Sequence, residues 1–194
     1  IKAMYDATAK YNITEATPYH SSVSVSDDVK NSVRAPEAGY NFDSSTTIRN
    51  IEPWGFKYSF SVNNKALSEY TDYGVVVLSG ADNAPVDAKE LVNNEKAVMY
   101  SKSGKNIYDV ENDANTAAAY HVNGITIANY DKNTYAVFFV KDSNGDYHYS
   151  EVISNSYKEI AEKDTSDSSA VSKAILNYAQ KYNEYVDAIS KKNN

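Results

Sequence analysis

Aromatic residues stand beside amides and carboxylates in several short stretches of this sequence. Tyr40 and Phe42 flank Asn41 in the stretch EAGYNFD, and Tyr108 lies in the stretch NIYDVEND. A flat aromatic ring next to hydrogen-bonding side chains is a combination that binds sugars, because the ring stacks while the polar groups bind hydroxyls. The candidate ligand-binding residues are Trp54, Tyr40, Phe42, Tyr108, Tyr120, His121, Asn106 and Asp109.

Each of these aromatic residues also has a structural interpretation. Trp54 follows Pro53 at the start of an alternating run, which places its ring near an edge, but it shares parity with Phe56, which favours the core. Tyr120 and His121 are neighbours on one predicted strand, so they point to opposite faces and one of them faces outward. Tyrosine is abundant, with 18 residues against 5 phenylalanines, and its preference for strands accounts for much of that bias.

The sequence carries no catalytic motif. It has three histidines and no cysteine, so cysteine nucleophiles and zinc–thiolate sites are excluded. It contains no G-x-S-x-G elbow, no H-E-x-x-H helix and no P-loop. A glycosidase needs two carboxylates about 5–10 Å apart across the sugar, and no acidic residue stands in an apolar context that would raise its pKa. We therefore expect a protein that is not an enzyme.

An acidic turn raises the alternative of a calcium site. Asp142, Asn144 and Asp146 follow an Asp-x-Asn-x-Asp pattern, but Gly145 stands one position too early and Ile153 replaces the glutamate that an EF-hand requires. Asn144-Gly145 is instead typical of a tight hairpin turn, because both residues accept positive φ angles. The acidic loop DVENDAN is a second place where calcium could bind, although a solvated loop is the commoner role. We expect no cofactor or metal, with calcium as the alternative.

The charge of the chain limits its partners. Lysine and arginine number 19 and aspartate and glutamate 26, so the net charge is −7. An acidic chain without a basic run is a poor binder of nucleic acid. No apolar run approaches the roughly 20 residues of a membrane helix. We expect no signal peptide in this stretch and, because it starts without methionine, we expect it to be an excised piece of a longer chain. We expect a monomer that neither binds nucleic acid nor inserts into a membrane.

Most of the chain follows the two-residue period of β-strands. Residues 54–62 alternate strictly, while residues 73–79 are apolar on both faces, as in a central strand. Residues 134–152 form two strand-like runs around the turn DSNGD. We expect short helical insertions in KALSEYT and DAKELVNN, and loops at 35–45 and 104–115. About seven short strands with turns between them predict a mainly β fold, an antiparallel β-sandwich.

Amphipathic helices are predicted at both ends of the chain. Residues 1–12 and 167–190 space their apolar side chains at helical intervals, and they share the similar stretches AKYN and AQKYN. We divide the chain into an N-terminal helix and linker (1–20), a β-sandwich domain (21–164) and a C-terminal amphipathic helix (165–194). Because its apolar stripe is costly to leave in water, the last helix should pack on the sandwich or on its N-terminal counterpart, or link to the next module.

The stretch VNGITIANYDKNTYAVFFVKDSNGDYHYSEVISNSYKEIAEK resembles a module of secreted, cell-surface proteins of gut Firmicutes. The matching positions are Gly124, Ile125, Asp131, Lys132, Tyr135, Ala136, Val140, Lys141, Asp142, Gly145, Tyr147, Tyr149 and Ser150. The stretches YGVVVL and AILNYAQKY are also similar to that module. The resemblance covers about the last two-thirds of the chain and implies an immunoglobulin- or fibronectin-like sandwich. Within this group it points to the starch-adherence proteins of ruminococcal amylosomes.

The resemblance implies a non-catalytic carbohydrate-binding module of a bacterial cell-surface protein that captures polysaccharide. The expected ligand is an α-glucan, either starch or a maltooligosaccharide, and the other expected partners are neighbouring modules of the same chain. Because α-glucans curl, aromatic residues dispersed over separate loops, such as Tyr40, Trp54 and Tyr108, would suit them. The alternative is a structural spacer or adhesion module of a multidomain surface protein with no glycan ligand, which predicts that aromatic rings are buried almost throughout.

Overall fold

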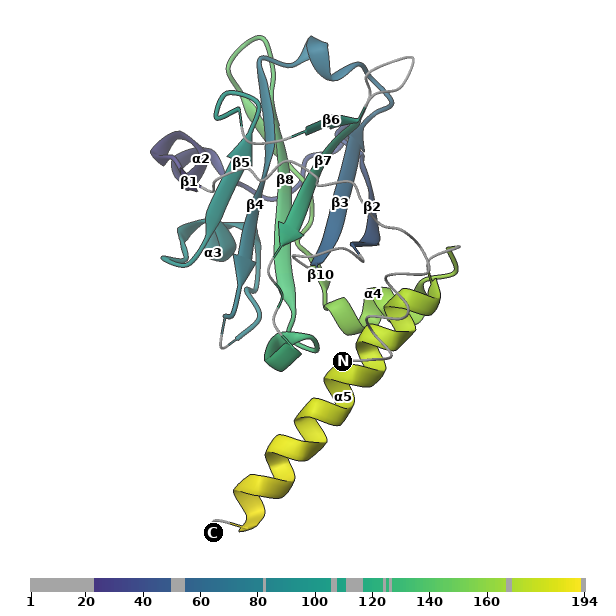
Figure 1. Ribbon diagram of the computed structural model, residues 1–194. Helices are drawn as coiled ribbons and strands as arrows, with labels where there is room; N and C mark the ends of the chain where they lie inside the picture. Colours follow the sequence, from purple (N-terminus) through teal and green to yellow (C-terminus); the bar gives the residue numbers. More distant parts are fainter. Residues whose placement is uncertain are drawn as a thin grey trace.

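The structure is a computed structural model that describes residues 23–49, 55–81, 83–105, 108–110, 117–123, 125, 127–166 and 169–192. Two antiparallel β-sheets share one core, and helices lie around them (Figure 1). The predicted mainly β, antiparallel sandwich with a C-terminal helix is therefore confirmed. An immunoglobulin-like order of the strands stays a prediction. The helix expected within residues 1–20 lies outside the described residues.

Sheet A contains six strands in the described part of the chain. They are β1 (Val23–Ser24), β4 (Asp72–Ser79), β5 (Val98–Ser101), β8 (Thr134–Lys141), β9 (Tyr147–Tyr149) and β10 (Ile153–Asn155). The order is β1-β5-β4-β8-β10, and β9 also pairs with β8. β4 and β8 pair along their whole length, from Asp72 opposite Lys141 to Ser79 opposite Thr134. The run predicted as a central strand thus lies in the middle of sheet A.

Sheet B contains four strands in the described residues, in the order β2-β3-β7-β6. They are β2 (Phe42–Arg49), β3 (Gly55–Val62), β6 (Tyr108–Val110) and β7 (Ala117–Asn123). The loop predictions for 35–45 and 104–115 were wrong where β2 and β6 lie. In β2 only Phe42 and Ile48 are large and apolar. The strand is held instead by its ladder to β3, which runs from Phe42 opposite Val62 to Arg49 opposite Gly55.

The inner faces of the two sheets form the main core. The alternation predicted for 54–62 is confirmed in β3, whose inward side chains are fully or almost fully buried. Phe60 stacks on Phe138 with ring centroids 4.6 Å apart, and Tyr100 stacks on Tyr120 at 3.7 Å. Each pair joins one sheet to the other, so stacked rings fix how the sheets face each other.

Two short helices cover the outer face of sheet A and create a second core. They are α2 (Asp27–Ser32) and α3 (Ala88–Asn93). Val29 of α2 and Leu91 of α3 pack against Val76 and Phe139 of the sheet. The Ser26 side chain caps α2 and the Asp87 side chain caps α3, which satisfies N–H groups of each first turn. The central strands of sheet A, β4 and β8, are therefore buried on both faces.

Two helices follow the last strand. They are α4 (Tyr157–Lys163) and α5 (Ser169–Lys192). A capping box between Ser156 and Glu159 starts α4. Tyr157 and Ala161 of α4 form a third core with Val171 and Ile175 of α5, and Ile48 of β2 packs against it. The predicted C-terminal helix is confirmed and packs through its first half. Its second half projects from the sandwich (Figure 1) and has exposed apolar residues, which are Tyr182, Tyr185, Val186 and Ile189.

Two 3₁₀ helices, η1 (Leu67–Glu69) and η2 (Ile127–Asn129), complete the described elements. The helical insertions predicted in KALSEYT and DAKELVNN appear as η1 and α3. Across the described residues, no helix combines the length and the apolar character that crossing a membrane requires.

Candidate functional site

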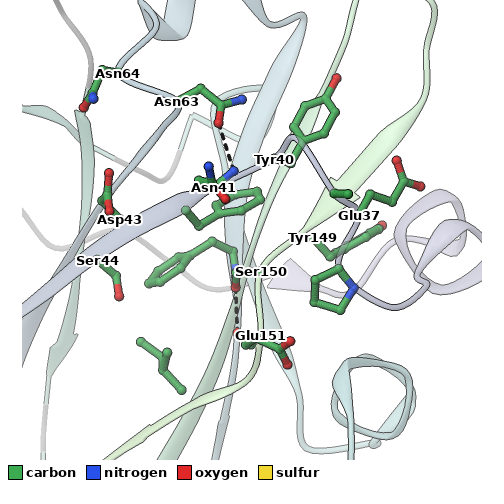
Figure 2. A pocket seen from close by; sticks show the side chains of 15 residues that line it. Glu37, Tyr40, Asn41, Asp43, Ser44, Asn63, Asn64, Tyr149, Ser150 and Glu151 are labelled. Atoms are coloured by element: carbon green, nitrogen blue, oxygen red, sulfur yellow. Dashed lines mark hydrogen bonds between the residues drawn. The ribbon is translucent and has the colours of Figure 1, made fainter.

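A groove lies at one open side of the sandwich, where β2 at the edge of sheet B faces the segment that joins β9 to β10 (Figure 2). We call it the Tyr40 groove, and its volume is about 830 Å³. Its walls consist of residues 36–38, 40–44, 63–64 and 149–151, with Phe138 and Ile153. The groove is therefore built from edge strands and the loops beside them.

Asn63 holds the loop that carries Tyr40. Its Nδ2 donates to the carbonyl oxygen of Gly39 at 2.9 Å. Its Oδ1 accepts from the N–H of Asn41, also at 2.9 Å (Figure 2). The N–H of Asn63 donates in turn to the carbonyl oxygen of Asn41 at 3.0 Å. Asn63 has a φ of 52°, a left-handed conformation that asparagine tolerates. Since both polar atoms of its side chain are engaged, Asn63 positions the loop.

His148 fixes the same loop from the side of sheet A. Its Nδ1 lies 3.0 Å from Oε2 of Glu37, and its Nε2 lies 3.3 Å from Oδ2 of Asp142. The ring of Tyr40 stacks on the imidazole with centroids 3.5 Å apart and an interplanar angle of 7°. Each ring nitrogen thus faces a carboxylate oxygen, one from the loop and one from the turn between β8 and β9. One face of Tyr40 is therefore covered, and a ligand can reach only the exposed remainder of the ring.

Asp142 closes the turn between β8 and β9. Its Oδ1 accepts from the N–H groups of Asn144 at 2.8 Å and Asp146 at 3.0 Å. Burial opposes ionisation of this carboxyl, but these hydrogen bonds and His148 outweigh it and lower the pKa of Asp142. The predicted hairpin is confirmed, and Gly145 has the positive φ, 92°, that its turn requires. Both carboxylate oxygens of Asp142 thus have partners within the protein.

The polar lining of the groove is acidic. Glu37, Asp43 and Glu151 contribute carboxylates, and no lysine or arginine is among the described lining residues. Asn41 and Asn64 are exposed and add two amides. In Figure 2, Asp43 lies on one side of the groove and Glu37 on the other. An acidic lining repels phosphates and carboxylates, so the groove disfavours anionic ligands.

The structure brings two of the predicted ligand-binding residues into this groove, namely Tyr40 and Phe42. Tyr40 is half-exposed, whereas Phe42 begins β2 and packs partly against the main core. Trp54 and Asn106 lie outside the described residues. The position of Tyr40 beside exposed amides and carboxylates is the part of the predicted site that the structure describes in full.

The other predicted residues lie away from the groove. Tyr108 and Asp109 belong to β6, and the structure describes only their backbone. Because β3 and β7 lie between β2 and β6, these residues and Tyr40 are at opposite edges of sheet B. Tyr120 is buried and stacks on Tyr100 in the main core. The backbone of His121 lies in β7, and its side chain is outside the described part.

Three groove residues, Asn63, Asn64 and Glu151, were not among the predicted site residues, and neither was His148, which holds the loop from behind. The sequence does indicate a turn at Asn63 and Asn64, because two consecutive asparagines after an alternating strand are typical of a turn with positive φ. His148 has the opposite parity from its two tyrosine neighbours, so it must face the other side of the sheet. Which loop it meets there depends on the packing of distant segments.

A scan against protein-family models found no matching family, and searches of curated proteins and of solved structures found no matching protein. Among the described residues, no group of three or more His, Asp or Glu side chains is placed to hold a metal ion. The acidic loop DVENDAN falls largely outside the described residues.

Proposed function

We propose that this chain is a non-catalytic carbohydrate-binding module whose ligand occupies the Tyr40 groove. The observation that supports this most is one concave surface on which half-exposed Tyr40 lies beside exposed Asn41, Asp43 and Asn64. An aromatic ring stacks on the C–H face of a sugar, amides donate to and accept from hydroxyl groups, and a carboxylate accepts two such bonds.

The carboxylates of the groove suit binding better than hydrolysis. Glu37 is engaged by His148 and lies 3.7 Å from Arg34, so its role is to hold the loop. Asp43 and Glu151 stand at exposed positions and have no apolar surrounding. A glycosidase needs one carboxylic acid kept protonated by an apolar surrounding. We therefore propose that the ligand is bound without being cleaved.

The proposed ligand is an α-glucan, such as starch or a maltooligosaccharide, met at the surface of a bacterial cell. The support is the resemblance to surface modules of polysaccharide-degrading gut bacteria together with an acidic, cysteine-free composition. A single half-exposed ring with polar neighbours also suits a curved chain better than the flat row of rings that a straight chain uses. One stack and a few hydrogen bonds predict a modest Kd, on the order of 10–1,000 μM.

A structural spacer or adhesion module is the second candidate, and the burial of the aromatic rings favours it. Most of the described aromatic side chains lie in the three cores, and α5 projects from the sandwich as a connector would (Figure 1). In that function Tyr40 would only brace its loop against His148. The chain would then be a monomer between neighbouring modules and would bind no glycan.

Binding measurements with groove variants separate the two functions. Asn64→Gly removes an amide while tolerating the φ of 54° at this position, and Asp43→Ser removes an exposed carboxylate from β2. Each should weaken maltoheptaose binding about three- to tenfold in isothermal titration and leave the Tm nearly unchanged. Tyr40→Ala should weaken binding further, but it also uncovers His148, so its Tm must be measured alongside.

The matched control is Tyr185→Ala, which removes an exposed tyrosine, 64% accessible, from α5. It should bind maltoheptaose as the unmodified chain does. A pull-down on insoluble starch and on cellulose accompanies the titration. If no glucan binds, the spacer function replaces this proposal, and binding to cellulose alone would keep the class of protein but reject the ligand.

A further inference from the structure

A second groove adjoins the first one. It has a volume of about 650 Å³ and contains the half-buried ring of Tyr135, so we call it the Tyr135 groove. Three residues, Pro36, Ser150 and Glu151, line both grooves. The two grooves therefore meet at the break between β9 and β10, where the loop that leads to Tyr40 passes.

The two grooves are lined mainly from opposite faces of sheet A, and only Tyr149 of the second core also reaches the Tyr40 groove. Ile153 lines the Tyr40 groove and packs against the main core, whereas Val152 lines the Tyr135 groove and packs against the second core. Successive side chains of a strand point to opposite faces, which is consistent with this division. A path from one groove to the other must therefore turn around the edge of sheet A.

The rim of the Tyr135 groove carries an apolar side chain that the fold does not use. Asp87 caps α3 by accepting from the N–H of Glu90 at 2.8 Å, and Oε2 of Glu90 accepts from the N–H of Val86 at 2.6 Å. The turn is thus fixed by two hydrogen bonds. An apolar residue just before an N-cap commonly packs on the first turns of its helix, yet Val86 is 90% exposed. Its side chain remains available to a ligand.

The polar groups of the Tyr135 groove are mixed in charge. Arg34 and Lys89 stand with Asp87 and Glu151, and Asn133 adds an amide. The groove therefore attracts neither anions nor cations strongly, and its ring and amide repeat the combination found in the Tyr40 groove. The same chemical class of ligand, a neutral chain of sugars, fits both.

We propose that the Tyr135 groove is a second subsite for the same glycan, so that one chain runs from the Tyr40 groove past Pro36 and Glu151 into the Tyr135 groove. This inference rests on the proposed function. A ligand that follows this path bends around the sheet edge, as a curled α-1,4-linked chain does and an extended β-1,4-linked chain does not. The bend gives the protein a preference for α-glucans long enough to reach both grooves.

A chain-length series tests the second subsite. Maltoheptaose should bind the unmodified chain about tenfold more tightly than maltotriose in isothermal titration, since only the longer ligand reaches both grooves. Val86→Ser removes the exposed apolar rim, and Tyr135→Leu removes the ring while keeping an apolar side chain. Both variants should reduce the affinity gain of maltoheptaose over maltotriose to about threefold or less, without weakening the binding of maltotriose itself. Val23→Ser, at an exposed valine of β1 on the opposite edge of sheet A, is the matched control and should keep the full gain.

The outcomes distinguish this inference from the proposed function. Equal affinity for the two lengths, or a gain that survives both groove variants, overturns the second subsite and leaves binding in the Tyr40 groove intact. A similar gain between cellotriose and cellohexaose contradicts the bent path. If neither maltotriose nor maltoheptaose binds, the proposed function and this inference fall together.

Discussion

The two sheets of the sandwich differ in how many of their faces are buried. In sheet A, Val75 and Val76 of β4 point to opposite faces, and both are completely buried. In sheet B, Phe56 of β3 is completely buried, whereas Lys57 and Ser59 on the other parity are half-exposed. Sheet A thus lies between sheet B and the helices α2 and α3, while the described part of β3 packs fully on one face only.

This difference shows what the apolar patterns of the strands require. A run that is apolar on both faces needs a layer on each side, and an alternating run needs one. The covering helices have only six residues each and would not be stable alone. They form because Val29 and Leu91 complete the second core, so this core and the two helices stabilise each other.

The largest expected effect comes from opening the second core. Phe139 of β8 is completely buried and lies on the helix-covered face of sheet A. Phe139→Ala should lower the free energy of unfolding by about 3–5 kcal/mol, because it leaves a cavity among residues that cannot collapse into it. Urea unfolding followed by circular dichroism measures the loss. A loss below about 1 kcal/mol would mean that the outer layer of sheet A is not a true core.

A smaller loss is expected where sheet A is packed too closely for a side chain. A Cβ added to Gly74 would collide with the carbonyl oxygen of Tyr100 and lie 2.6 Å from Cζ of Phe139. Because the backbone oxygen cannot move easily, Gly74→Ala should lower the free energy of unfolding by about 1–3 kcal/mol. Gly80→Asn is the control, since Gly80 has a φ of 67° with open space around it and asparagine tolerates that conformation. Equal Tm values for the two variants would contradict the close packing.

At the edge of sheet A the turn is held by the charged side chain of Asp142 and not by apolar packing. The expected loss of unfolding free energy is therefore smaller than for Gly74→Ala. The pKa of Asp142 is lowered in the folded chain, so its ionised form stabilises the fold above the unfolded pKa. That contribution is lost as the pH falls through the folded pKa. Asp142→Asn should lower the free energy of unfolding at neutral pH by about 1 kcal/mol or less and flatten its fall in acid.

Urea unfolding of Asp142→Asn at several values from about pH 6 to about pH 2 checks this pH dependence. Asp146→Asn, at an exposed residue of the same turn, is the control and should follow the unmodified chain. A steeper acid loss in Asp142→Asn than in the unmodified chain would show that the carboxylate does not stabilise the fold.

The smallest effect is expected on the outer face of sheet B. Lys57 is half-exposed in the middle of β3 and lies opposite Thr47 of β2. Lys57→Ala should change the free energy of unfolding by no more than about 0.5 kcal/mol, because it removes little buried surface. Urea unfolding under the conditions used for Phe139→Ala gives a direct comparison of the sheets. A loss close to that of Phe139→Ala would show that this face is covered as well.

Elements with a clear apolar period were predictable from the sequence. β3 alternates, β4 and β8 are apolar on both faces, and α5 carries a helical stripe, so each has one conformation that buries its apolar residues. β2 has no such period, because serine and threonine fill its middle. It becomes a strand only when β3 offers its backbone groups, which is a tertiary effect that local propensity does not contain.

The candidate site was predictable only where its residues are close in sequence. Tyr40 and Phe42 stand out because polar residues adjoin them along the chain. The partners that shape the groove come from far away, since Glu37 and His148 are 111 residues apart and Asn41 and Asn63 are 22 apart. Their meeting depends on how the two sheets stack, and no local pattern records that arrangement.

The attachment of α5 has a mechanical consequence. The helix has 24 residues, which makes it about 36 Å long at 1.5 Å per residue, and its buried residues end at Ala179. The remainder is a lever arm whose fulcrum is the contact with α4. A sideways force near Lys192 is multiplied at that joint, whereas an axial pull loads the contacts of Val171 and Ile175 in shear. The joint is centred on the third core, so a load carried by the helix acts on that small contact before it reaches the sheets.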